Sequence, residues 1–240
     1  MNIGIFFIGV DKYIELFENF KKSFNQYFLP NHSKKYFVIT DSEEFIPDEG
    51  DHKVLVEDEG WRKCNLHRYK YFLQCDTTGM DYLYFFNGNS ICFKTINDED
   101  VIPGEEYDYM CGLWHYFHKS MLPYDTNPES VCYMETNERN YAFRGGMHGG
   151  RRDKFLEMCQ ICSDMIDRNG DYIPTWNDEA YFNKYAEHRN VMKITHHIYS
   201  YVYYFKSKIH TVSKHKLFGK DYIIKRKKLD DKYHINHMLN

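Results

Sequence analysis

Short apolar runs that alternate with helix-like stretches constrain the fold of this chain more than any other feature. The runs that predict buried strands are Ile3–Ile8, Tyr36–Thr40, Val54–Val56 and Asp81–Phe86. Between them, Ile14–Phe28 carries apolar residues at helical spacing, and a second helix is predicted over about Lys63–Gln74. This β-α-β-β-α-β order predicts an α/β fold in which helices cover a largely parallel sheet.

The rest of the chain is less regular. Tyr109–Trp114 and Tyr141–Phe143 have strand character, and the second of these leads into a glycine-rich stretch, Gly145–Gly150. Helices are predicted over about Asp153–Asp167 and from Trp176 to about Glu187. No low-complexity linker interrupts the chain, so one domain is the default for 240 residues.

Composition argues against several classes of protein. A net charge of −4 disfavours generic nucleic-acid binding, and the chain has no run of about 18 apolar residues that would predict a membrane span. The first ten residues lack the basic leader of a signal peptide and predict a buried strand instead. The seven cysteines are scattered, which favours a reducing cytoplasm. Cys159 and Cys162 have redox or metal spacing, but we expect them to pack in the core.

A polar triplet, Asn87-Gly88-Asn89, directly follows the apolar run that ends at Phe86. Ligands of parallel sheets bind beyond the carboxyl ends of the strands, and Asp41 falls at another such end. Two carboxylates at this place would hold a divalent metal on a nucleotide diphosphate, whereas two neutral amides would not. Because Asn-Gly is also a common turn dipeptide, the triplet alone predicts a turn.

Further segments share an order and a spacing with a known family. They are Ile5–Tyr13, Tyr36–Asp41, Asn65–Leu73, Asp81–Asn89, Gly112–His115, Tyr141–Gly150, Trp176–Glu179 and Asn183–Tyr185. Together, over about residues 3–187, they resemble glycosyltransferase family six, the family of the blood-group A and B transferases and the α-1,3-galactosyltransferase. Bacterial members similar to this chain carry Asn-x-Asn in place of Asp-x-Asp and work without a metal.

The resemblance implies a GT-A fold, a single Rossmann-like domain over residues 1–240 with a mixed central sheet. About residues 1–90 would form the nucleotide-binding half, about 91–190 the acceptor and catalytic half, and about 191–240 a segment that closes over the donor. The implied reaction moves galactose or N-acetylgalactosamine from a UDP-sugar to an oligosaccharide or glycolipid acceptor. It retains the anomeric configuration, forms an α-1,3 linkage and uses no metal ion or other cofactor.

The resemblance also assigns roles to single residues and makes Glu179 the nucleophile. The implied donor-binding residues are Ile8, Tyr13, Arg68, Asn87, Asn89, Arg144, Gly145, Gly146, Asp178, Lys225 and Arg226. The implied acceptor-binding residues are His115 and Trp176, and no residue is assigned to a metal.

The chemistry of Glu179 fits that role. A carboxylate beside the anomeric carbon can attack it or stabilise oxocarbenium character. Because Glu179 falls in the first turn of a predicted helix, we expect the helix dipole to keep it ionised. Without the resemblance, Asp178 and Glu179 would be expected merely to begin a helix, with Asn177 or Asp178 as its N-cap.

Two positions depart from the family. Arg144 stands where relatives have a small or apolar residue, so the resemblance does not decide between galactose and N-acetylgalactosamine as the donor sugar. Asn177 stands where many members have a histidine. Gly146 leaves room for an acetamido group, which favours N-acetylgalactosamine slightly. Without a metal, the charge of departing UDP needs cationic side chains. Candidates are Arg68 and the basic cluster Lys225–Lys228, which otherwise forms a solvated tail.

Two other functions compete with this one. Arg144, Asn177 and the divergent C-terminal segment are compatible with a catalytically silent protein that binds sugar nucleotides or glycans. A glycoside hydrolase that uses Glu179 and Asp178 is disfavoured, because adjacent residues rarely place carboxylates on opposite sides of one bond.

Overall fold

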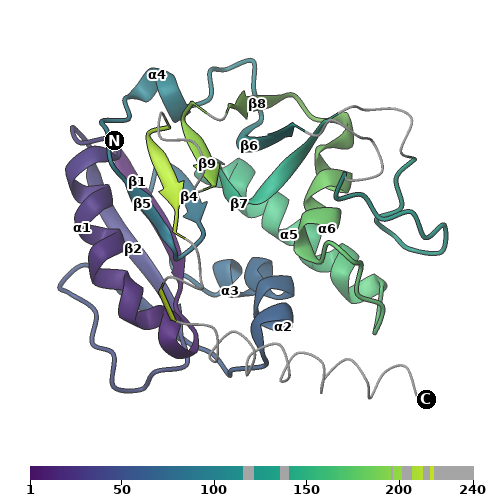
Figure 1. The fold of residues 1–240 in the computed structure, drawn as a ribbon, viewed down its shortest axis with the longest axis horizontal. Coiled ribbons are helices and arrows are strands. Elements are labelled where there is room, and N and C mark those ends of the chain that lie inside the picture. The colour runs from purple at the N-terminus through teal and green to yellow at the C-terminus, as the bar shows by residue number, and fades with distance from the viewer. Residues whose placement is uncertain (116–121, 136–140, 196, 202–206, 213–216, 219–240) are drawn as a thin grey trace.

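The computed structural model describes residues 1–115, 122–135, 141–195, 197–201, 207–212 and 217–218. A seven-stranded sheet in the order β3-β2-β1-β4-β7-β6-β8 runs through the molecule, with helices packed against it (Figure 1). Its strands are β1 (Asn2–Ile8), β2 (Ser33–Thr40), β3 (His52–Leu55), β4 (Tyr82–Phe86), β6 (Tyr109–His115), β7 (Tyr141–Arg151) and β8 (Val191–Ile194). A smaller sheet, in the order β5-β10-β9, contains β5 (Ser90–Cys92), β9 (Tyr199–Tyr201) and β10 (Ile209–Thr211).

Helices lie between several of these strands. Among the described residues the α-helices are α1 (Phe17–Tyr27), α2 (Trp61–Leu66), α3 (Arg68–Leu73), α4 (Asp98–Val101), α5 (Arg152–Arg168) and α6 (Asp178–Tyr185). The 3-10 helices η1 (Asp11–Leu16) and η3 (Ala186–His188) precede α1 and follow α6. No helix within the described ranges is long and apolar enough to cross a membrane.

The large sheet is mixed but mostly parallel. β3, β2, β1 and β4 are parallel neighbours, and β6 is parallel to β8. β7 runs antiparallel to both β4 and β6. This arrangement is that of a GT-A-like domain, and it confirms the α/β fold with a mixed central sheet.

Two aromatic cores cover the two faces of the sheet, because successive strand residues point to opposite sides. Phe6 in β1 packs on Phe72 of α3 and Phe155 of α5, with ring centres 4.4 and 5.3 Å away. Its neighbour Phe7 points to the other face and lies 5.1 Å from Phe20 of α1. The short apolar runs of the sequence are therefore buried on both faces, as parallel strands require.

Some boundaries differ from the prediction. The helix expected at Lys63–Gln74 is two short helices, α2 and α3, that meet at His67, whose ψ of 4° is not helical. The strand expected at Tyr141–Phe143 continues through the glycine-rich stretch to Arg151, because β4 and β6 pair with it on both sides. All seven cysteines are buried free thiols, which confirms the core packing of Cys159 and Cys162.

Candidate active site

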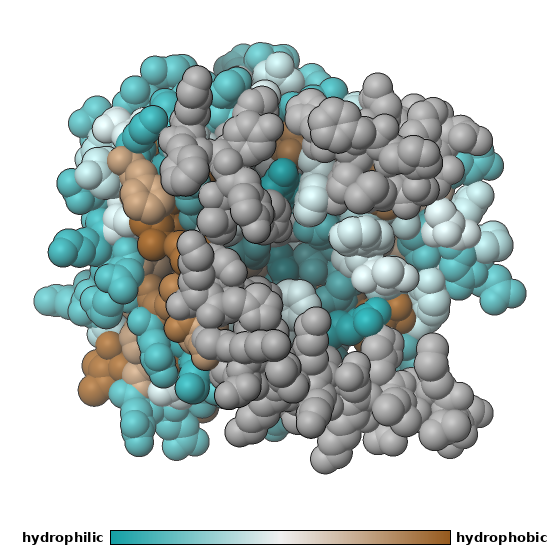
Figure 2. Space-filling view, in the orientation of Figure 1, coloured by the Kyte–Doolittle hydropathy of each residue, from teal (hydrophilic) through white to brown (hydrophobic). Residues whose placement is uncertain are grey.

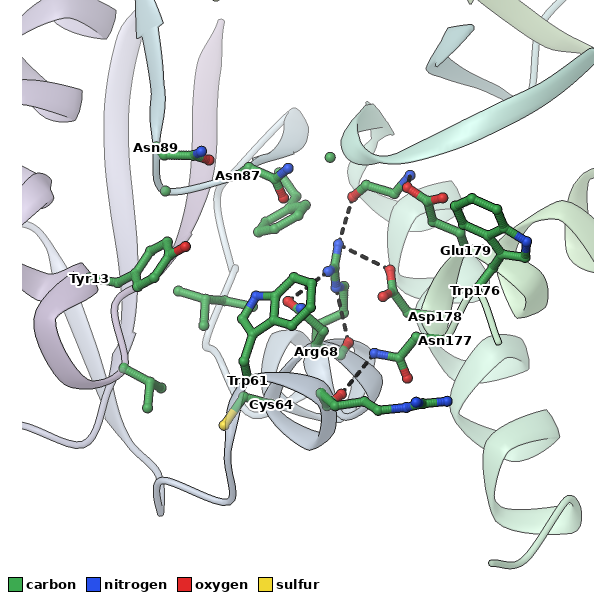
Figure 3. A pocket seen from close by; sticks show the side chains of 18 of the residues that line it. Tyr13, Trp61, Cys64, Arg68, Asn87, Asn89, Trp176, Asn177, Asp178 and Glu179 are labelled. Atoms are coloured by element: carbon green, nitrogen blue, oxygen red, sulfur yellow. Dashed lines mark hydrogen bonds and ion pairs between the residues drawn. The ribbon is translucent and has the colours of Figure 1, made fainter. Parts of the chain in front are cut away.

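A pocket of about 500 Å³ lies beyond the carboxyl ends of β1 and β4. Its walls come from the loop after β1, the turn after β4, α2, the start of α6 and the glycines of β7. Figure 2 shows a hollow with hydrophilic side chains near the middle of this face. In Figure 3, Tyr13 and Asn89 lie on one side of the pocket, Asp178 and Glu179 lie on the other, and Arg68 lies between them.

Arg68 is a buried cation at the centre of this site. It is the first residue of α3, and only 3% of it is exposed. Its Nη1 donates a 2.6 Å hydrogen bond to the carbonyl of Gly145 and lies 3.2 Å from Asp178 Oδ2. Its Nε and Nη2 donate to the carbonyl and the side-chain oxygen of Asn65, both at 3.0 Å. Arg68 therefore joins α2, β7 and α6 and places a fixed positive charge in the pocket.

Two carboxylates stand beside that cation at the start of α6. The Oε1 atom of Glu179 accepts a 2.9 Å hydrogen bond from the backbone N–H of Gly145. Burial, and then the neighbouring Asp178, raise the pKa of Glu179 to about 7, although the Gly145 hydrogen bond, Arg68 and Arg144 oppose the shift. Burial also raises the pKa of Asp178, and Arg68 opposes that shift.

The structure does not support the expectation that the helix dipole keeps Glu179 ionised, because burial and Asp178 raise the pKa of its carboxyl to about 7. A helix dipole stabilises a carboxylate at the N-terminus by up to about 2 kcal/mol. At Glu179 the loss of hydration and the neighbouring Asp178 destabilise the carboxylate by more than that. The structure thus places Asp178 and Glu179 side by side, as the sequence predicts, and raises the pKa of both carboxyls.

Asn177 precedes these acids and is the N-cap of α6, as one of the two predicted alternatives. Its side chain makes no capping bond; its Nδ2 donates instead to the carbonyl of Arg62 at 2.8 Å. The backbone has φ 54° and ψ −129°, a combination that residues with a side chain rarely adopt. Asn177 therefore anchors α6 to α2 at the cost of local strain.

The Asn87-Gly88-Asn89 triplet forms the turn between β4 and β5, as predicted. The N–H of Ser90 donates to the carbonyl of Asn87 at 2.8 Å, and the N–H of Asn87 donates to the carbonyl of Gly146 at 3.0 Å. Both asparagines line the pocket. The Nδ2 of Asn89, however, donates to the carbonyl of Val212 at 2.7 Å, so that atom is engaged within the chain.

The glycines of β7 allow this turn and the acids of α6 to approach the strand closely. A Cβ on Gly145 would lie 2.7 Å from Asp178 Oδ2. A Cβ on Gly146 would collide with the amide of Asn87 and lie 2.8 Å from the Tyr199 hydroxyl. The space beside Gly146 is thus filled by protein, and the argument that it leaves room for an acetamido group has no support in the structure.

Arg144 is not among the residues that line the pocket. Its guanidinium lies over the ring of Trp114, 4.4 Å from the ring centre, and its Nε donates to the carbonyl of Leu113 at 3.1 Å. Its charge lowers the pKa of Glu179, so it acts on the site electrostatically in the donor-free protein.

Tyr13 and Ile8 both line the pocket, and Tyr13 lies on the side opposite the acids (Figure 3). The ring centre of Tyr13 lies 5.0 Å from that of Phe218, at 46°. Asp41 lies outside the pocket lining, and its Oδ1 accepts a 2.9 Å hydrogen bond from the N–H of Asp11. This bond joins the end of β2 to the first residue of η1, the 3-10 helix that carries Tyr13.

The three tryptophans of the chain all line the pocket, although only Trp176 was singled out from the sequence. Trp61 and Trp176 are 46% and 38% exposed, and the rings of Trp176 and Trp114 lie 6.5 Å apart, edge to face. Further lining residues that sequence reasoning missed are Val10, Arg62, Cys64, Asn65, Phe85 and Thr175. The one available signal was Trp61 itself, a large apolar residue that begins a helix after the acidic stretch Glu57–Glu59.

Side chains of the remaining predicted residues lie outside the described part of the structure. The backbone of His115 ends β6 and pairs with Tyr141 in the ladder. Lys225 and Arg226, with the rest of the basic cluster, lie outside the described residues.

A family model described as Glycosyltransferase family 6 matches residues 1–222. The chain belongs to glycosyltransferase family 6. Members of this family transfer a sugar from a donor to an acceptor, so the pocket is the candidate active site of a glycosyltransferase.

Curated relatives of this family 6 glycosyltransferase are distant in sequence. The O-antigen biosynthesis glycosyltransferase WbnI of Escherichia coli is 28% identical over 195 residues, which cover 77% of this chain and 82% of WbnI. The globoside alpha-1,3-N-acetylgalactosaminyltransferase 1 of Homo sapiens is 19% identical over 198 residues, and that of Canis lupus familiaris is 20% identical over 197. The chain spans 56% of the length of each of these two mammalian relatives.

Proposed function

We propose that the chain is a retaining glycosyltransferase that moves N-acetylgalactosamine or galactose from a UDP-sugar to a glycan acceptor, with an α-1,3 linkage and without a metal ion. The main support for this proposal is one observation: Glu179 and the buried Arg68–Asp178 ion pair line the same pocket as Tyr13 and Asn87. The pocket volume of about 500 Å³ is within the usual range of about 300–1,000 Å³ for small-molecule sites.

In the proposed reaction, ionised Glu179 attacks the anomeric carbon while the bond from that carbon to the UDP oxygen breaks. An acceptor hydroxyl then attacks the same carbon, frees Glu179 and passes its proton to a phosphate oxygen of UDP. Two inversions give net retention. Asp178, held by Arg68, would accept hydrogen bonds from donor-sugar hydroxyls, and Tyr13 would stack on uracil.

The ligand chemistry of the pocket supports the metal-free part of the proposal. Asn87 and Asn89 line the pocket as neutral amides, and they offer a divalent cation no carboxylate oxygen. Arg68 supplies one fixed positive charge against the charge that develops on UDP. We assign the remaining charge to Lys225, Arg226 and their basic neighbours.

Donor, acceptor and location are the finer parts of the proposal. The mammalian relatives are named alpha-1,3-N-acetylgalactosaminyltransferases, which supports that sugar and that linkage for this chain, with galactose as the second donor to test. Trp176, 38% exposed in the pocket, offers an apolar wall to one face of an acceptor sugar, and His115 remains an acceptor candidate. We place the enzyme in the cytoplasm.

The direct test measures UDP release from UDP-N-acetylgalactosamine and UDP-galactose, first without acceptor and then with a glycan panel. We expect slow hydrolysis of one donor, and equal activity in EDTA and in added Mn²⁺. Loss of activity in chelator with recovery in Mn²⁺ would contradict the metal-free mechanism.

The catalytic role is tested with Glu179→Gln, which should abolish transfer while UDP still binds in calorimetry. Glu187→Gln is the matched control, because Glu187 lies after α6 in an ion pair with Lys184 and outside the pocket lining. UDP binding without any UDP release from either donor in the wild-type protein would favour the second candidate function, a silent sugar-nucleotide-binding protein.

A further inference from the structure

The C-terminal segment is joined to the turn after β4 through Asn89. β10 pairs antiparallel with β5, with Thr211 opposite Ser90, and Val212 therefore falls opposite Asn89. The N–H of Val212 donates to the carbonyl of Asn89 at 2.8 Å, and the Nδ2 of Asn89 donates to the carbonyl of Val212 at 2.7 Å. The side-chain amide of Asn89 thus supplies the second hydrogen bond of the last rung between the two strands.

This rung needs an amide and not a carboxylate at position 89. Asn89 is only 9% exposed, and the atom of its side chain that touches Val212 is a donor. An aspartate of the same shape would place an anionic oxygen against the carbonyl of Val212, so two acceptors would face each other away from water. The asparagine therefore has a role toward the protein's own chain that is independent of any metal.

Phe218, six positions after Val212, lies at the same pocket. Phe218 lies against Tyr13, with ring centres 5.0 Å apart, and both Tyr13 and Asn89 line the pocket. The described parts of the C-terminal segment thus touch the pocket at two of its lining residues, on the side opposite Glu179 (Figure 3).

We infer that Asn89 is a positioning residue: its amide fixes Val212 and thereby helps to hold Phe218 against Tyr13 in the pocket wall. Its effect on the reaction is indirect and acts on donor affinity, because Tyr13 lines the donor pocket. The effect on donor affinity rests on the proposed function, whereas the tether itself does not.

Hydrogen–deuterium exchange tests the tether without any substrate. Peptides that cover residues 209–218 should exchange faster in Asn89→Asp and Asn89→Ala than in the wild-type protein. Ser90→Ala is the matched control, because its buried hydroxyl has no hydrogen-bond partner among the described residues, and it should leave these peptides unchanged. Asn89→Ala removes the donor without adding charge and serves if the aspartate variant does not fold. Unchanged exchange in a folded Asn89 variant would overturn the inference.

Steady-state kinetics and calorimetry test the consequence for the donor. Both Asn89 variants should raise the Kd for UDP and the KM for the UDP-sugar about tenfold, the size expected for one unpaired buried hydrogen-bonding group. The kcat at saturating donor should change by less than about twofold, because the groups around Glu179 are untouched. Faster exchange with an unchanged Kd in the variants would overturn the positioning role. If the wild-type protein does not bind UDP, the proposed function is contradicted. The hydrogen–deuterium exchange result then tests the tether by itself.

Discussion

The backbone N–H of Gly145 donates a 2.9 Å hydrogen bond to the carboxylate of Glu179 and so couples the middle of β7 to the first turn of α6. The bond favours the ionised carboxylate, but burial and Asp178 outweigh it and hold the pKa of Glu179 at about 7. The protonation state of the candidate nucleophile is therefore balanced near neutral pH, where small changes of its surroundings have measurable effects.

The first prediction concerns the pH dependence of the reaction. Because only the carboxylate form of Glu179 attacks carbon, kcat/KM for the UDP-sugar should rise with pH, bend near pH 7 and level off above it. Initial rates measured from pH 5 to pH 9 at low donor concentration give this rise of kcat/KM, the acid limb of the pH profile. A flat profile across pH 6–8 would show that ionisation of Glu179 does not limit the reaction.

A second prediction concerns stability. The folded-state pKa of Glu179, about 7, lies above the ordinary value of 4.5, so the folded protein loses stability as pH rises from about 4.5 to above 7. Glu179→Gln keeps an oxygen that can accept from Gly145 and never ionises. The free energy of unfolding of this variant should be about 1–3 kcal/mol higher than that of the wild-type protein at pH 8, and equal to it at pH 4. Urea melts at the two pH values measure the difference, and an equal difference at both would contradict this account.

A third prediction separates the charge of Arg144 from its shape. Because Arg144 lowers the pKa of Glu179, Arg144→Met should raise that pKa and move the acid limb of the rate profile to higher pH. Arg144→Lys keeps the charge, although it loses much of the stacking on Trp114, and should leave the limb near its wild-type position. If both variants shift the limb equally, packing on Trp114 and not charge sets the protonation of Glu179.

A fourth prediction concerns the glycines of the large sheet. Gly145→Ala would press a methyl group against Asp178 and Glu179, and we expect kcat/KM to fall about 10- to 100-fold, since misplacement of reacting groups is costly. Gly112→Ala on the neighbouring strand β6 is the matched control, because its Cβ would make ordinary contacts of 3.4–3.6 Å. The check is kcat/KM of both variants, together with a thermal melt of each. An equal loss of kcat/KM in the two variants would show that the substitutions disturb the sheet as a whole and not the acids of α6.

The sequence predicted those parts of the fold that depend on local pattern. The apolar runs at Ile3–Ile8 and Asp81–Phe86 became neighbouring buried strands because their residues are apolar on both faces. The break at His67 and the continuation of β7 to Arg151 depend on pairing and side-chain contacts from distant segments, which periodicity does not carry. Family resemblance supplied half of the pocket, since ten of its 20 lining residues were predicted: Ile8, Tyr13, Arg68, Asn87, Asn89, Gly145, Gly146, Trp176, Asp178 and Glu179.

What the sequence missed has a common physical cause. The bond from Asn89 to Val212 joins residues 123 positions apart, and the pKa of Glu179 depends on burial beside Arg68 and Asp178, which only the folded chain creates. Trp61 lies in none of the segments that resemble the family, and a single exposed aromatic side chain at the start of a helix is a weak signal until its neighbours are known.

The placement of every tryptophan of the chain in the pocket lining, at positions 61, 114 and 176, makes the protein its own optical reporter. Excited at the red edge, where tyrosine does not absorb, the protein emits from this pocket alone. Any donor, acceptor or inhibitor that enters should quench or shift that emission, whereas events on the far face of the sheet should leave it unchanged. An unlabelled sample in a fluorimeter can therefore screen ligands for this site before a single product has been identified.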